Sequence, residues 1–203
     1  MAVRAERTET RGAFLDAAER LLIEVGYAGI TSRRVAEEAG ANQGLVYYYF
    51  GSMEELFVQV LERFTDRLTE RQRAMYAADA SFLEKWRTAM RFLDEDLAVG
   101  YPKIWLELQA LAWNRPELRQ RVAHVNAQWR AVLTEALGGA MKDYGLDRRR
   151  FPVAAIVSLV ITFNEGMLLE RVSGISEGHR ELLGTIDRWL RSLEAENDRG
   201  ERS

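Results

Sequence analysis

The chain has 203 residues, of which 47% are hydrophobic, so it is long enough to bury a substantial core without covalent or metal staples. It contains no cysteine, which excludes disulfides, thiolate zinc sites and cysteine nucleophiles. Its formal net charge is −3, so no overall basic field attracts nucleic acid, and an argument for DNA binding has to rest on local geometry.

Apolar residues recur at intervals of three and four along the chain, which is the period of amphipathic helices and predicts an all-α protein. The first helix is expected over residues 8–25, with Gly26 as its C-terminal cap. A short second helix follows Thr31, which has the chemistry of an N-cap. A third short helix is expected over residues 42–50.

The segment "SMEE" that follows is typical of a capping box at the start of a long fourth helix, which we expect to reach about residue 76. In such a box Ser52 accepts a hydrogen bond from the backbone N–H of Glu55, and the Glu55 carboxylate reaches back to the N–H of Ser52. The remaining helices are expected over residues 81–98, 102–113, 116–144, 152–172 and 176–194.

The second and third helices, joined by "AGANQG", have the lengths and turn chemistry of a helix-turn-helix. Short helix pairs also pack in proteins that bind no DNA, so this spacing alone leaves both interpretations open. On a helical wheel the inward positions of the third helix are Val46, Tyr49 and Phe50. The outward positions are Gly44, Leu45, Tyr47 and Tyr48. A glycine inside a helix costs about 1 kcal/mol relative to alanine, so its place here favours the close approach of another surface.

Residues 14–56, "FLDAAERLLIEVGYAGITSRRVAEEAGANQGLVYYYFGSMEEL", resemble the DNA-binding domain of the TetR family of transcriptional regulators. The family pattern combines "G-aromatic-x-x-x-T", "V/I-A-x-x-A-G" and "G-x-x-Y-x-x-F" at the same spacing. The resemblance implies a DNA-binding domain over residues 1–52, with its helix-turn-helix at about 31–50. It also implies a larger helical domain for effector binding and dimerisation over residues 53–203.

The same resemblance implies which side chains contact DNA. Residues at the start of the second helix would touch phosphates, and those at the start of the third would face base edges, with tyrosines against sugar and phosphate. Gly44 would let the helix sink into the groove. The predicted DNA-binding residues are Thr31, Ser32, Arg33, Asn42, Gln43, Gly44, Leu45, Tyr47 and Tyr48.

One position departs from the family pattern. Where the family usually has lysine just after the recognition helix, this chain has Met53, so one phosphate contact is expected to be missing. Arg4, Arg7 and Arg11 would compensate if the N-terminal segment forms a basic arm, and the alternative is a solvated terminus.

The run from residue 151 to residue 163 is apolar on nearly every side, so its helix must be covered by more than one neighbour. In a monomer it would be a central core helix, whereas the resemblance implies that it and the last helix form a four-helix dimer interface. We favour the dimer, because reading a palindrome requires two recognition helices about 34 Å apart. The predicted interface residues are Leu168, Leu169, Val172, Leu182, Leu183, Ile186, Trp189, Leu190 and Leu193.

All five tryptophans lie beyond residue 80, within the second predicted domain. Bulky flat side chains around a few polar groups describe a small-molecule pocket, although each such residue is more often ordinary core. The resemblance places an effector pocket among the middle helices. The candidate lining residues are Trp86, Met90, Trp105, Leu108, Gln109, Trp129, Phe163, Asn164 and Met167.

No catalytic constellation is recognisable, because nucleophile-elbow, phosphate-loop, zinc-protease and calcium-loop motifs are all missing from the sequence. His124 and His179 are the only histidines, and both are expected to be packed or solvated. The apolar run is shorter than the ~20 residues of a membrane span, and the first residues form no apolar signal segment. We therefore expect a cytoplasmic protein without enzyme activity, cofactor or membrane partner.

The combined reading is a repressor that binds a palindromic DNA operator as a homodimer and is released by a small apolar or aromatic effector. Two alternatives stay open at this point. One is an all-α scaffold whose helix-turn-helix binds protein, and the other is a TetR-like regulator that has no effector.

Overall fold

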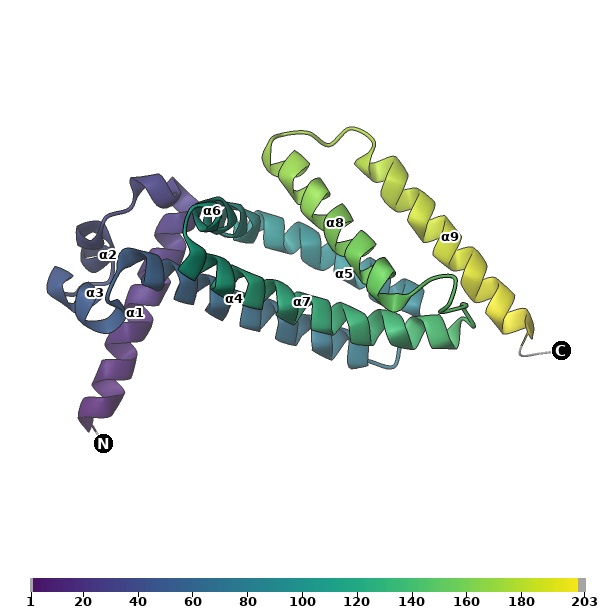
Figure 1. The fold of residues 1–203 in the computed structure, drawn as a ribbon, viewed down its shortest axis with the longest axis horizontal. Coiled ribbons are helices and arrows are strands. Elements are labelled where there is room, and N and C mark those ends of the chain that lie inside the picture. Colours follow the sequence, from purple (N-terminus) through teal and green to yellow (C-terminus); the bar gives the residue numbers. More distant parts are fainter. Residues whose placement is uncertain (1, 201–203) are drawn as a thin grey trace. The chain divides into compact units, whose positions relative to one another are not determined.

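The computed structural model describes the backbone of residues 2–200 and the side chains of residues 7–197 and 199. Within this range the chain forms helices and turns without a strand, which confirms the all-α prediction (Figure 1). The elements are α1 (Ala2–Val25), the 3-10 turn η1 (Tyr27–Gly29), α2 (Ser32–Glu38), α3 (Gln43–Phe50), α4 (Met53–Ala77), α5 (Phe82–Ala98), α6 (Tyr101–Trp113), α7 (Pro116–Asp143), α8 (Val153–Val172) and α9 (His179–Gly200).

Most helix bounds agree with the sequence prediction, and the exceptions have local causes. Helix α1 begins at Ala2 rather than at residue 8, because the preceding residues are mostly alanine, arginine and glutamate, which favour helix. Helix α9 begins only at His179, since Gly178 has a φ of +78° that a helix cannot continue through. Helix α7 runs uninterrupted through the glycine pair at 138–139.

The chain divides into two compact units. Unit one comprises Met1–Arg67 and Val99–Val125, and unit two comprises Leu68–Ala98 and Asn126–Ser203, so α4 and α7 contribute residues to both. This division follows packing. The predicted boundary after residue 52 concerns which residues serve DNA binding, and it stays a prediction.

We call α1, α2 and α3 together the head. The core of the head forms around Phe14 of α1. The Phe14 side chain is fully buried, and its ring centroid lies 6.2 Å from that of Phe50 and 6.1 Å from that of Tyr49 on α3. Val35 of α2 and Val46 of α3 are also fully buried. These contacts hold α2 and α3 against α1 and leave the opposite face of α3 open.

Helix α6 contacts the end of α1 and the turn after it through two hydrogen bonds. Lys103 Nζ donates a hydrogen bond to the Ile23 carbonyl oxygen at 2.9 Å, and the Glu107 carboxylate accepts one from the backbone N–H of Tyr27. Gly26 makes room for that carboxylate, because a Cβ at this position, where φ is +72°, would lie 2.6 Å from Glu107 Oε1. The junction after α1 is therefore part of a packed polar contact.

In unit two, α9 is held to α5 by an ion pair and a helix cap. The Arg87 guanidinium donates to both carboxylate oxygens of Asp187, at 2.6 and 3.0 Å, and these bonds lower the pKa of Asp187 to about 2. Glu194 Oε1 accepts from the backbone N–H of Leu83 at 3.0 Å and from the Tyr144 hydroxyl at 2.9 Å. These contacts determine which face of α9 is turned away from its own protomer.

Helix α8 is not a central core helix within the protomer. Val157 and Met167 are its buried residues, whereas Leu159 is 65% exposed and Leu169 is 55% exposed. Helix α8 extends beyond the apolar run to Val172, as the sequence predicted. Among the described residues it is the one helix long and apolar enough to cross a membrane. This is weak evidence for a membrane, because helices of soluble proteins have the same composition.

Candidate nucleic-acid interface

Both short helices of the helix-turn-helix begin at side-chain caps. Thr31 Oγ1 accepts from the Arg34 backbone N–H at 3.2 Å, which confirms the predicted N-cap of α2. Asn42 Oδ1 caps α3 by accepting from the Gly44 N–H at 2.8 Å. A Cβ on Gly44 would lie 3.3 Å from that oxygen, so glycine fits the tight cap as well as an approaching DNA surface.

The aromatic run of α3 divides as the helical wheel predicts. Val46 and Phe50 are buried and Tyr49 is half-buried, while Tyr47 is 49% exposed and Tyr48 is 63% exposed. The head therefore presents two tyrosine rings on the face opposite its core. A face of this kind, next to a helix start, suits the sugar and phosphate of a DNA backbone.

At the start of α2 the three predicted phosphate contacts differ in exposure. Thr31 and Arg33 are exposed, and Arg33 pairs with Glu37 one turn further along at 2.8 Å. Ser32 is only 7% exposed, and its hydroxyl oxygen accepts hydrogen bonds from Gln43 and Tyr47. The structure thus brings three predicted DNA-binding residues into one hydrogen-bonded cluster, and Ser32 is not a surface group.

Two arginines of α1 reach the recognition helix, which the sequence analysis left undecided. Arg7 Nη2 donates to the Tyr48 hydroxyl at 2.9 Å, with its guanidinium carbon 5.5 Å from the ring centroid. Arg11 lies over the Phe50 ring at 5.6 Å and donates to the Gln59 side chain. The side chain of Arg4 lies outside the described residues. The spacing of four between Arg7 and Arg11 is the signal from which a common face on a continued α1 could have been predicted.

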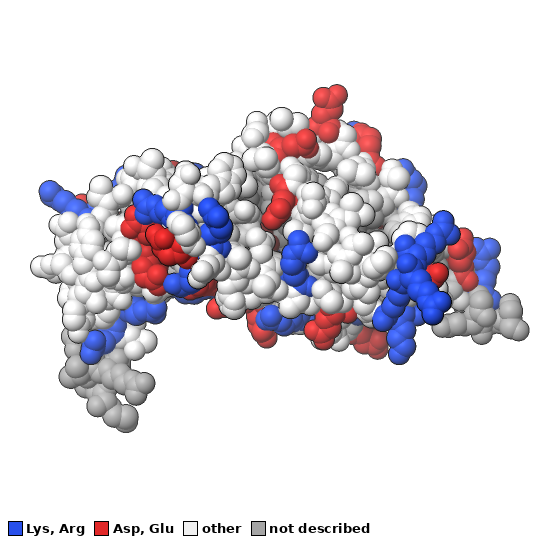
Figure 2. All heavy atoms as spheres, in the orientation of Figure 1, with Lys and Arg blue, Asp and Glu red and all other residues white. Residues whose placement is uncertain are grey.

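Two arginines of the head are paired with carboxylates of α2. Arg20 pairs with Glu38 at 2.9 Å, as Arg33 does with Glu37. Figure 2 shows basic and acidic side chains next to one another on the drawn face of the chain. Among the residues whose side chains are described, the arginines of the head without an ion pair are Arg7, Arg11 and Arg34, whereas Arg20 and Arg33 are paired.

The start of α4 is braced from α7. The Glu55 backbone N–H donates to Ser52 Oγ at 3.1 Å, which confirms the first half of the predicted capping box. The Glu55 carboxylate accepts from Arg121 at 3.0 Å and also from Gln59. Arg121 further makes a bidentate pair with Glu62 at 2.6 Å, and these carboxylates raise its pKa above the ordinary arginine value.

The predicted effector residues fall into different units. Trp105 and Leu108 are buried in unit one, together with the half-buried Gln109. The members in unit two are Trp86, Met90, Trp129, Phe163, Asn164 and Met167. A common lining for all nine therefore stays a prediction.

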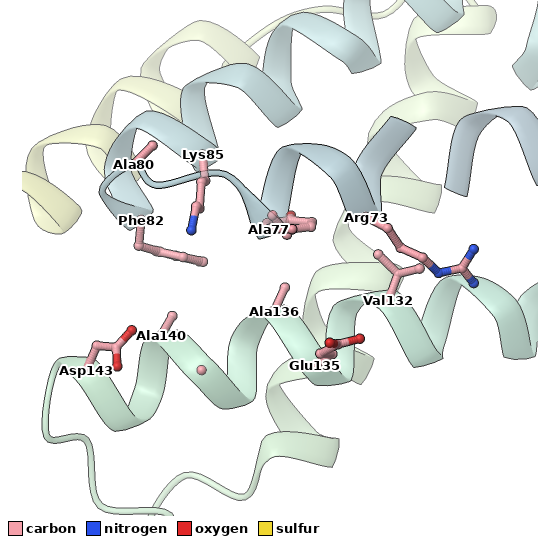
Figure 3. A pocket seen from close by; sticks show the side chains of 12 residues that line it. Arg73, Ala77, Ala80, Phe82, Lys85, Val132, Glu135, Ala136, Ala140 and Asp143 are labelled. Carbon is pink, nitrogen blue, oxygen red and sulfur yellow. The ribbon is translucent and has the colours of Figure 1, made fainter. Parts of the chain in front are cut away.

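Unit two contains a pocket of about 400 Å³ between the end of α4, the start of α5 and the second half of α7 (Figure 3). Lys85 and Phe82 reach into it from the α5 side, and Ala136 and Ala140 form the facing wall of α7. Burial raises the pKa of the lining residue Tyr76 to about 12. The lining residues are Arg73, Tyr76, Ala77, Ala80, Phe82, Lys85, Val132, Glu135, Ala136, Gly139, Ala140 and Asp143.

None of the nine predicted effector residues lines this pocket, which the sequence analysis missed. The two basic and two acidic lining residues balance in formal charge. The pocket exists because one face of α7 carries the small residues Ala136, Gly139 and Ala140. In the sequence, the two alanines are typical of any helix. The glycine pair at 138–139 was the available signal in the sequence, because Gly139 lines the pocket.

The predicted dimer surface is partly exposed within the protomer. Leu169 and Trp189 are each 55% exposed, Val172 is 49% exposed and Leu182 is 44% exposed. The half-buried members are Leu168, Leu183, Ile186 and Leu193. Leu190 is a correction, because it is 5% exposed and packs inside its own protomer.

A helix-turn-helix with an open aromatic face, followed by a larger all-helical region, has the architecture of a DNA-binding transcriptional regulator. Residues 14–60 match the family described as bacterial regulatory proteins, tetR family. The HTH-type transcriptional regulator CymR of Pseudomonas putida is 30% identical over 150 residues, which are 71% of this chain and 71% of CymR. The protein belongs to the TetR family.

Two further similarities extend over most of the chain. The HTH-type transcriptional repressor AcnR of Corynebacterium glutamicum is 25% identical over 191 residues, covering 91% of this chain and 94% of AcnR. The crystal structure of FadR from Bacillus subtilis in complex with stearoyl-CoA has the same fold, with a TM-score of 0.71 at 18% identity, covering 88% and 96% of the two chains. AcnR and CymR are both named as regulators of transcription.

Proposed function

We propose that this regulator is a cytoplasmic repressor that binds a palindromic operator as a homodimer and leaves it when a small apolar or aromatic effector binds. The observation that carries the DNA-binding part is the exposed pair Tyr47 and Tyr48 on a recognition helix whose other face is core. AcnR, named a repressor, supports the direction of regulation.

In the proposed complex, Thr31 and Arg33 contact phosphates at the positive end of α2. Asn42, Gln43 and Leu45 face base edges in the major groove. Tyr47 and Tyr48 press their rings against the sugar-phosphate backbone, and Gly44 permits close approach. Ser32 is left out of the contact set because its hydroxyl is buried.

The proposed dimer uses the outward faces of α8 and α9. Several large apolar side chains of leucine, valine and tryptophan are exposed there. A monomeric protein seldom leaves an apolar surface of this kind in contact with water. Leu159, 65% exposed, joins the predicted members, and Leu190 is removed. A twofold arrangement would place two recognition helices on successive turns of one duplex.

Selection of bound sites from random duplex DNA tests this proposal. We expect enrichment of a palindrome whose half-sites lie about 10 base pairs apart, or a multiple of that spacing, centre to centre. Binding should weaken steeply with salt. A chain that enriches no sequence and binds generic duplex DNA without salt dependence would instead support the protein-binding scaffold.

Arg7 is proposed to supply the phosphate contact that Met53 does not make. Arg7→Gln should lower DNA affinity and make the plot of log affinity against log salt shallower by about 0.9 per protomer. The matched control is Arg11→Gln, because Arg11 donates to Gln59 of α4, outside the predicted contact set, whereas Arg7 donates to Tyr48, which belongs to that set. Equal salt slopes for the Arg7 variant and the wild type, in fluorescence anisotropy titrations, would contradict the contact.

The effector part of the proposal rests on the pocket in unit two and on the FadR relative, whose structure contains stearoyl-CoA. An effector releases DNA only if it binds the DNA-free state more tightly. We expect some flat apolar compounds to quench tryptophan fluorescence, raise the melting temperature and weaken operator binding. A diverse library without any such compound would favour the regulator that has no effector.

A further inference from the structure

The side chain of Ser32 points inward, although it is the first residue of α2. It is 7% exposed, while Thr31 before it and Arg33 after it are both exposed. A serine that binds a DNA phosphate has to present its hydroxyl at the surface. Its burial, next to two residues of the recognition helix, indicates a different role.

Two side chains of α3 donate hydrogen bonds to the Ser32 hydroxyl oxygen. Gln43 Nε2 lies 2.9 Å from Ser32 Oγ, and the Tyr47 hydroxyl lies 3.2 Å from it. Gln43 and Tyr47 are four residues apart and so share one face of α3. Because a serine oxygen has two lone pairs, these two bonds use both of them.

The hydrogen bond to Ser32 leaves Gln43 able to read a base. The amide nitrogen carries two N–H groups, and Ser32 engages one of them, so the other N–H and Oε1 remain. A neighbouring donor and acceptor match N7 and the N6–H of adenine in the major groove. An amide already held in place loses less rotational freedom when it binds, which favours the matching base.

The Tyr47 hydroxyl is held in the same way. Its single proton points at Ser32, so it is not available to a phosphate oxygen, which only accepts hydrogen bonds. The Tyr47 ring is thereby fixed in orientation on the outward face of α3, where the residue is 49% exposed. Tyr47 thus contacts the backbone through its ring rather than through a donated hydrogen bond.

We propose that Ser32 is a positioning residue that sets the base preference of the recognition helix by orienting Gln43 and Tyr47 without touching DNA itself. The partner that this arrangement fits is an A·T pair in the major groove of each half-site. The inference rests on the proposed DNA-binding mode. Within that mode, the Ser32 hydroxyl would determine which base pair Gln43 prefers.

The test compares Ser32→Ala in two backgrounds of the full chain, the wild type and the double variant Gln43→Ala with Tyr47→Phe. Affinity is measured by anisotropy for the selected operator and for duplexes changed one base pair at a time. In the wild type we expect Ser32→Ala to lower operator affinity about tenfold and to flatten the preference at one base pair of each half-site. In the double variant, Ser32→Ala should change affinity by less than about twofold, because the groups that it orients are gone.

Arg33→Ala is the matched control, since it alters the neighbouring, exposed residue. It should weaken binding to all duplexes alike and make the salt dependence shallower by about 0.9 per protomer. Base preference is a ratio of two affinities measured on one protein sample. Partial unfolding of a variant lowers both affinities by the same factor, so it leaves the base preference unchanged.

Three outcomes would overturn the role of Ser32. The first is equal weakening on every duplex, and the second is an undiminished effect of Ser32→Ala in the double variant; either would mean that Ser32 does not set the base preference through Gln43 and Tyr47. The third is unchanged affinity and preference. In each case a wild-type protein that still selects a palindrome keeps the proposed function intact, whereas a wild type that does not bind DNA refutes that function first.

Discussion

Trp189→Glu should abolish tight operator binding while leaving each protomer folded. Trp189 is 55% exposed on α9, on the surface proposed to meet a second copy, so the change costs little within the protomer. In the dimer it would bury an unpaired carboxylate against apolar side chains, which strongly opposes association. A monomer has one recognition helix and loses the gain from simultaneous binding, which is about 10²- to 10⁴-fold.

Sedimentation velocity and anisotropy on the same samples measure both effects. The control is Arg180→Glu, which introduces the same side chain near the start of α9, where the arginine side chain is 93% exposed. The control should remain a dimer and bind the operator normally. If Trp189→Glu stays dimeric with wild-type affinity, the proposed interface lies elsewhere.

Phe14→Ala is expected to destabilise the head by about 3 to 5 kcal/mol, the usual cost of truncating a fully buried phenylalanine. The ring meets Phe50 edge-on and Tyr49 at a tilt, so the substitution leaves a cavity at the centre of the three helices. Tyr49 is only half-buried, which makes Phe14 the stronger anchor of α3. We expect partial loss of helix at room temperature and no operator binding.

The comparison variant is Tyr48→Ala, because Tyr48 is aromatic and belongs to the same cluster but is 63% exposed. It should change the free energy of unfolding by less than about 1 kcal/mol and still reduce DNA affinity. Urea unfolding followed by circular dichroism separates the two. Similar unfolding midpoints for both variants would mean that the aromatic cluster is not the core of the head.

Local chemistry explains why the helix-turn-helix was predictable. At each of the caps Thr31, Asn42 and Ser52, the two bonded residues are at most three positions apart. Such caps can therefore be recognised from neighbouring residues in the sequence. The inward and outward faces of α3 follow from helical periodicity over eight residues, and burial agrees with them except at Leu45, which was predicted to face outward and is half-buried. The early start of α1 was missed, although helix propensity alone favours it.

The amino-acid sequence by itself determined the helices, their caps, the recognition face and the family, because these depend on neighbours along the chain. Only the tertiary structure decided that Ser32 turns inward onto Gln43, that Leu190 is buried, and that small residues of α7 leave a pocket opposite Phe82. Each of these depends on a side chain from another helix. Spacing along one helix defines a face, and packing in three dimensions decides what that face meets.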